Sequence, residues 1–124
     1  MVTRSSIVVC DDNDMLRWSL VLHLEQRGYQ CATATDGLEL LELLETSEPD
    51  LVLLDLSMPK MGGLEALGRL RAQGSTIPVI VMTGSGDLAR SDAEALGATT
   101  TIAKPFATSE VGNLVDHHIG LSAK

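Results

Sequence analysis

Five polar side chains stand directly after short apolar runs of the sequence, where charged groups are otherwise scarce. They are Asp11, Asp12, Asp55, Thr83 and Lys104. Three carboxylates that lie within a few Å of one another repel, which raises the pKa of at least one of them. A divalent cation relieves that repulsion, and ligands that are all oxygens suit Mg²⁺ or Mn²⁺. If the fold brings these residues together, the pattern predicts an acidic metal site.

The same groups suit phosphoryl transfer. A carboxylate beside a bound divalent cation can attack phosphorus and become an acyl phosphate. The cation and a nearby ammonium group then neutralise the charge on the phosphoryl oxygens, and Lys104 is the ammonium group of this set. The hydroxyl of Thr83 can donate a hydrogen bond to a phosphoryl oxygen, and Gly84, which follows it, leaves room for the backbone to approach closely.

The elements that must position these residues alternate along the chain. The runs 7–10, 51–54 and 79–82 are apolar at every position, which is typical of strands covered on both faces in a parallel sheet. A fourth run spans 99–103, and a weaker one, 30–34, has the character of an edge strand.

Helical patterns separate the runs. We expect helices over about 14–27, after the N-cap residue Asp36, and over about 64–73, 87–96 and 109–119. The stripe of the fourth helix is mostly alanine, so it should pack weakly. Alternating strands and helices predict a doubly wound α/β domain with right-handed crossovers. In such folds the binding crevice lies beyond the carboxyl ends of the strands, where the five polar side chains fall.

Length and composition restrict the class of protein. The chain has 124 residues, and we expect one domain over 1–124. The formal net charge of -8 argues against a nucleic-acid-binding surface, which needs clustered Lys and Arg. No N-terminal apolar run is as long as a signal peptide or a membrane span, so we expect a cytoplasmic protein without membrane contacts.

Four segments together resemble a known family. They are IVVCDD, LVLLDLSMP, VIVMTGSGD and IAKPF, and they look like those of the response-regulator receiver family of two-component signalling. The resemblance covers essentially the whole chain, in order and at similar spacing. It implies a flavodoxin-like, five-stranded parallel sheet in the order 2-1-3-4-5 with five helices. The chain would be a stand-alone receiver or a domain of a larger protein.

The resemblance assigns a role to each carboxylate. Asp55 would accept a phosphoryl group from a histidine kinase or a histidine phosphotransfer protein. Asp11, Asp12 and Asp55, with the backbone carbonyl of Ser57, would hold Mg²⁺. Such a protein is not an enzyme for other substrates, because it catalyses only its own phosphorylation and dephosphorylation. Its output would pass to a downstream protein that the sequence does not identify.

The resemblance also predicts how the phosphoryl group is sensed. Thr83 and Lys104 would contact it, and the peptide bond before Pro105 would be cis, which a Lys-Pro bond permits at modest cost. One position departs from the family pattern. Three residues before Lys104 the family usually has Tyr or Phe, whose ring swings inward on activation, and this sequence has Thr101. An aromatic rotamer switch is therefore excluded at that position.

The first helix has a second apolar face, formed by Met15, Trp18 and Leu22 at spacings of three and four. In the family this helix binds kinases and phosphotransfer domains. We therefore expect a docking patch there, with Asp14 beside it. The alternative is that Trp18 packs against the helix at 109–119.

Other interpretations stay open at this point. A pseudo-receiver that binds partners without being phosphorylated would share the fold, although the complete set of five residues argues against it. A phosphohydrolase of the haloacid dehalogenase type also uses a strand-end Asp and Mg²⁺. It needs a second Asp two residues later, where this sequence has Ser57. Finally, Asp11 and Asp12 could simply cap the first helix, although Asn13 is also available.

Overall fold

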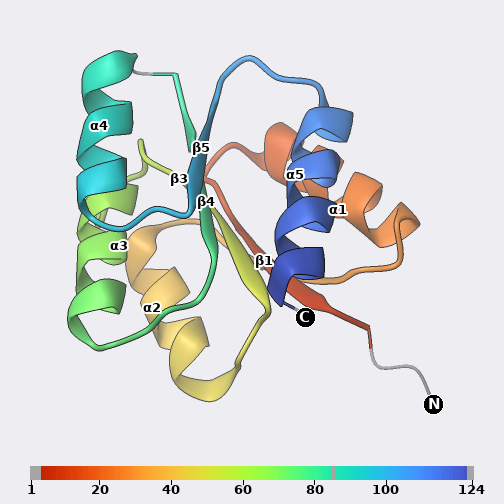
Figure 1. Ribbon diagram of the computed structural model, residues 1–124, viewed down its shortest axis with the longest axis horizontal. Coiled ribbons are helices and arrows are strands. Elements are labelled where there is room, and N and C mark those ends of the chain that lie inside the picture. Colours follow the sequence, from red (N-terminus) through yellow and green to blue (C-terminus); the bar gives the residue numbers. More distant parts are fainter. Residues whose placement is uncertain (1–3, 85, 123–124) are drawn as a thin grey trace.

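The computed structural model describes residues 4–84 and 86–122, in which strands and helices alternate (Figure 1). The strands are β1 (Ser6–Cys10), β2 (Gln30–Ala34), β3 (Leu51–Asp55), β4 (Val79–Thr83) and β5 (Thr100–Ala103). The helices are α1 (Asp14–Gln26), α2 (Gly37–Thr46), α3 (Gly63–Ala72), α4 (Asp87–Ala95) and α5 (Thr108–Ser122). The predicted elements are all present, and apart from α5 their bounds agree with the expected ranges to within a residue.

The five strands are parallel and lie in the order β2-β1-β3-β4-β5. This confirms the doubly wound sheet and its predicted order, with β2 at an edge. The register aligns the carboxyl ends of the central strands, because Cys10 pairs with Leu54 and Asp55 pairs with Met82. Residues that follow these strands therefore emerge along one edge of the sheet.

Helices cover both faces of the sheet, α1 and α5 on one and α2, α3 and α4 on the other (Figure 1). Side chains alternate between the two faces along each strand. Those packed with α1 and α5 are Ile7, Val9, Leu51, Leu53, Ile80 and Met82. Those packed with α2, α3 and α4 are Val8, Cys10, Val52, Leu54, Val79 and Val81. Because both sets are buried, the central strands are apolar at every position.

The N-cap of α1 is Asn13, so neither Asp11 nor Asp12 is needed to cap this helix. Asn13 caps α1, because its side-chain oxygen accepts the N–H of Leu16 at 3.0 Å. The interpretation of Asp11 and Asp12 as caps of this helix is therefore wrong. Asp36 caps α2 as predicted, by accepting a backbone N–H of the first turn at 2.8 Å.

The last helix is longer than its apolar pattern predicts. It continues to Ser122, past the expected end near Ile119. Gly120 lies exposed in this extension, and a glycine in a helix costs only about 1 kcal/mol relative to alanine. That penalty is too small to end the helix. None of the described helices combines the length and the apolar character that crossing a membrane requires.

A close backbone contact joins α3 to the end of β3. A Cβ at Gly63 would lie 2.2 Å from the backbone oxygen of Asp55 and 2.9 Å from the Cα of Leu56. Because these neighbours are backbone atoms, they cannot turn aside as a side chain can. Gly68, in the same helix, has ordinary room, with Cδ2 of Leu96 as the nearest atom at 3.8 Å.

These two glycines give a matched test of the fold. Gly63→Ala should lower the free energy of unfolding by about 1–3 kcal/mol, because it overpacks the end of β3. Gly68→Ala should raise it by up to about 1 kcal/mol, because alanine favours the helix and meets no clash. Urea unfolding of both variants measures the difference, and changes of the same sign would contradict the contact at Gly63.

Candidate functional site

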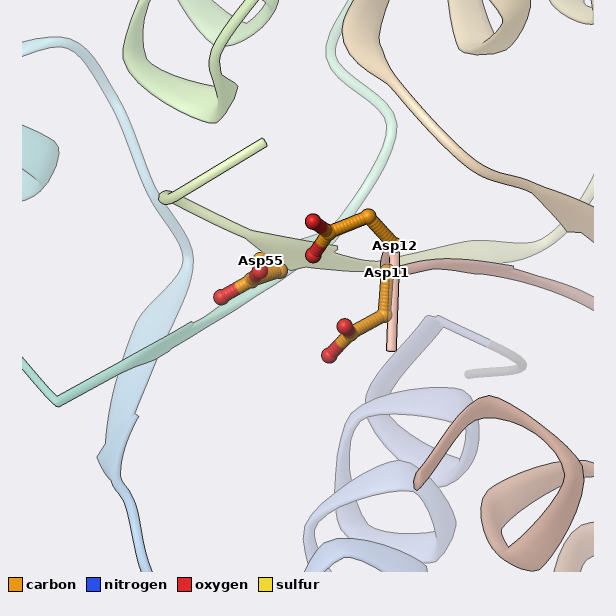
Figure 2. A group of neighbouring side chains, drawn as sticks. All are labelled: Asp11, Asp12 and Asp55. Carbon is orange, nitrogen blue, oxygen red and sulfur yellow. The ribbon is translucent and has the colours of Figure 1, made fainter. Parts of the chain in front are cut away.

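Three carboxylates meet at the carboxyl edge of the sheet, as predicted (Figure 2). Asp11 and Asp12 follow β1, and Asp55 is the last residue of β3. One carboxylate oxygen from each lies within 4.8 Å of those from the other two. Asp11 is fully buried and Asp55 is 4% exposed, whereas Asp12 is exposed to solvent. The cluster offers oxygen ligands only, so it could hold a hard divalent cation at a face that solvent reaches.

The ammonium group of Lys104 joins two of these carboxylates. Its Nζ lies 3.0 Å from Oδ1 of Asp55 and 3.2 Å from Oδ2 of Asp11. The residue follows β5, and its backbone N–H donates to the oxygen of Thr83 at 2.9 Å. The peptide bond between Lys104 and Pro105 is cis, as the resemblance implied. The predicted cation is therefore in contact with the acidic cluster.

Burial and charge act in opposite directions on the ionisation of this pair. Burial raises the pKa of Asp55 above its usual value, and the charge of Asp11 adds to that effect. The hydrogen bond from Lys104 opposes it and favours the ionised carboxylate. Burial by itself would lower the pKa of Lys104, but its hydrogen bond to Asp55 and the nearby negative charges outweigh burial and raise it. Lys104 therefore stays cationic at neutral pH.

Thr83 and Ser57 complete the surroundings of Asp55. Thr83 ends β4, is 3% exposed, and lies at the same edge of the sheet as the carboxylates. The backbone N–H of Ser57 donates a hydrogen bond to the Asp55 carboxylate. The role of the Ser57 carbonyl as a metal ligand stays a prediction, as does the contact of Thr83 with a phosphoryl group.

A buried arginine that the sequence analysis missed holds the loop after β1. Nη1 of Arg17 donates to the backbone oxygen of Asp11 at 2.8 Å, and Nη2 pairs with Oδ1 of Asp14 at 2.6 Å. Oδ1 of Asp11 also accepts the N–H of Asn13 at 2.9 Å. Arg17 is only 7% exposed. The spacing of Asp14 and Arg17 in one helix was the available signal, since residues three apart lie on the same face.

The apolar patch on α1 is open to solvent. Met15 is 83% exposed, and Trp18 and Leu22 are each 60% exposed. The alternative that Trp18 packs against α5 is therefore wrong. Other residues of α1 contact α5: Leu20, Val21 and Leu24 belong to the same buried apolar cluster as Val111 and Val115. Arg27, at the C-cap of α1, adds an ion pair to Asp116 at 2.6 Å.

Thr101 lies within β5, where it pairs with Val81. It is partly buried, and its short side chain has no ring. The departure from the family pattern therefore falls in the strand that directly precedes Lys104.

Comparisons with known proteins agree with this geometry. A family model described as the response regulator receiver domain matches residues 7–116. Sporulation initiation phosphotransferase F of Bacillus subtilis is 36% identical over 118 residues, which are 94% of this chain and 95% of that protein. The DNA-binding transcriptional regulator NtrC of Escherichia coli is 38% identical over 94% of this chain, but the match spans only 25% of NtrC.

Solved structures share the fold over nearly the whole chain. The receiver domain of the Francisella response regulator 1452 has a TM-score of 0.91 and 25% identity, with coverage of 96% of this chain and 99% of that one. The chemotaxis response regulator CheY4 of Vibrio cholerae has a TM-score of 0.87 and 26% identity, with coverage of 94% and 99%. Since the family model covers most of the chain and a curated relative matches it almost end to end, the chain belongs to the response regulator receiver domain family.

Proposed function

We propose that this receiver is a phosphorylation switch in which Asp55 accepts a phosphoryl group from a histidine kinase or a histidine phosphotransfer protein. The observation that supports this most is the setting of Asp55. It is a nearly buried carboxylate at a strand end, 3.0 Å from a lysine ammonium and grouped with two further carboxylates. A buried charged group is costly unless it is paired or used. Phosphoryl acceptance uses every member of the group.

The transfer step can be written with its electrons. A carboxylate oxygen of Asp55 attacks phosphorus, and the bond from phosphorus to the donor's histidine nitrogen breaks. That nitrogen keeps the electron pair of the broken bond and takes up a proton from water, so the donor is left with a neutral imidazole. Lys104 stays beside the new acyl phosphate and offsets its charge, and the hydroxyl of Thr83 donates to a phosphoryl oxygen.

The acidic cluster fits a magnesium ion. Its donors are carboxylate oxygens at close range, which suits a hard cation, and Mn²⁺ is a second candidate. Asp11, Asp12, Asp55 and the Ser57 carbonyl would hold the ion. When bound, it would neutralise charge on the phosphoryl oxygens and relieve the repulsion among the carboxylates.

The proposed activity is regulatory, and no other substrate is required. The protein would promote only its own phosphorylation and dephosphorylation, and would act in the cytoplasm on a downstream partner. A phosphohydrolase of the haloacid dehalogenase type would need a carboxylate at the position of Ser57, two residues after Asp55. The remaining alternative is a pseudo-receiver that is never phosphorylated, and the first experiment below separates it from a switch.

Phosphorylation of Asp55 can be tested with a small donor. The protein is incubated with Mg²⁺ and acetyl phosphate, and its intact mass is measured. We expect one phosphoryl group that alkali removes, and none in Asp55→Asn. Asp92→Asn, which changes an exposed aspartate of α4, should be phosphorylated like the wild type. A wild-type protein without an adduct would support the pseudo-receiver.

Magnesium should stabilise the folded chain through the exposed carboxylate of the cluster. At a Mg²⁺ concentration about a hundredfold above Kd, the free energy of unfolding should rise by about 2.7 kcal/mol. Asp12→Ala should lose most of that gain, because it removes a ligand that makes no other hydrogen bond among the described residues. Glu42→Ala, on the exposed face of α2, is the control for a lost charge. If Mg²⁺ raised the free energy of unfolding equally in both variants, that result would contradict the proposed metal site.

The patch on α1 predicts a difference between donors. Trp18→Ala should slow phosphotransfer from a histidine kinase or phosphotransfer protein by about 30-fold, the effect of losing about 2 kcal/mol at a docking hot spot. Transfer from acetyl phosphate should be unchanged. Leu38→Ala removes an exposed apolar side chain of α2 and should slow neither reaction. If Trp18→Ala slows both donors equally, the patch is not a docking surface.

A further inference from the structure

The fourth helix is lightly anchored. Ala93 is its only fully buried residue among those described, and Leu88 in its first turn is 77% exposed. Its N-cap, Gly86, has no side chain to accept the first N–H groups of the helix. A helix with so few buried contacts opens at low free energy and responds readily to a new interaction.

A pocket of about 270 Å³ connects this helix to the proposed phosphoryl site. Its lining residues are Thr83, Gly84, Gly86, Asp87, Arg90, Ala103 and Lys104. Lys104 binds Asp55 directly, and Thr83 follows Met82, the strand partner of Asp55. Two residues of the proposed phosphoryl site, Thr83 and Lys104, therefore line the pocket, and α4 contributes a second cation to it.

That second cation, Arg90, has an unused hydrogen-bond donor. Its Nε is buried and has no hydrogen-bond partner among the residues that the structure describes. Within residues 4–84 and 86–122, no ion pair joins Arg90 to Asp87, which lies three residues earlier in the same helix and also lines the pocket. A buried N–H without an acceptor is unfavourable, so an acceptor that enters the pocket and accepts this N–H would stabilise the guanidinium.

We propose that Arg90 couples the phosphorylation state of Asp55 to α4, by turning within this pocket to pair with an oxygen of the phosphoryl group. The inference rests on the proposed function of Asp55. A phosphoryl group brings up to about two negative charges and three strong acceptor oxygens, which match the fork of a guanidinium. Pairing would satisfy the donors of Arg90 and draw the first turn of α4 toward the site.

This coupling would replace the missing aromatic switch. With Thr101 in β5, no ring is available at that position to report phosphorylation to the helices. A long cationic side chain on α4 can report it by charge instead. Arg90 would then be a positioning residue that reads the phosphoryl group and orders α4, while Lys104 balances the charge at Asp55.

The test compares hydrogen exchange of α4 amides with and without beryllofluoride, a stable mimic of the phosphoryl group, in the presence of Mg²⁺. In the wild type, bound beryllofluoride should slow exchange in the first turn of α4 by about fivefold or more. Arg90→Gln should lose most of this slowing, and Arg90→Lys should recover part of it because it restores the charge. Arg69→Gln, an exposed arginine of α3 paired with Glu65, should behave like the wild type.

The outcomes separate this inference from the proposed function. Intact mass after incubation with acetyl phosphate and Mg²⁺, measured on the same protein preparations without beryllofluoride, reports whether Asp55 is phosphorylated. A wild type without an adduct overturns both. An adduct with no slowing in α4, or with equal slowing in the wild type and Arg90→Gln, overturns the role of Arg90 and leaves the switch standing.

Discussion

Two carboxylates, Asp11 and Asp55, are buried together at one edge of the sheet, and the ammonium group of Lys104 contacts both at 3.2 and 3.0 Å. Like charges in a buried place drive at least one carboxyl group to protonate unless a cation pairs with them. This pairing lets the site keep its negative charge. The same charge would attract a divalent cation, which under the proposed function would offset the charge of an incoming phosphoryl group.

The strand order makes that pairing geometrically feasible. The carboxylates come from β1 and β3, which are neighbours, and the lysine comes from β5, with β4 between. A long, flexible side chain is needed to reach across β4, and lysine supplies one. The remaining strand, β2, provides no site residue and lies at the far edge. The polar site residues therefore directly follow the apolar runs and do not replace any apolar side chain of the core.

The strands and the five site residues could be predicted because both depend on local pattern. Fully apolar runs identify strands covered on two faces, and the residue after each run must emerge at the carboxyl edge. The burial of Arg17 could not be predicted, since it depends on a backbone oxygen that only the folded loop presents. The exposure of Trp18 was one of two outcomes that the sequence allowed, because α1 is apolar on two sides and the pattern does not say which one faces the sheet. The close approach of Gly63 to β3 likewise depends on tertiary geometry.

The helices on the two faces of the sheet divide the surface of the molecule. The exposed patch of Trp18 lies on α1, which covers one face of the sheet, whereas α4 covers the opposite face (Figure 1). The acidic site lies at the carboxyl edge of the sheet. The two surfaces share no helix. A protein that loads the site from the side of α1 and a protein that reads α4 would approach from opposite directions. Under the proposed function, phosphorylation and its readout would therefore use separate surfaces, and a substitution that alters one surface would leave the other unchanged.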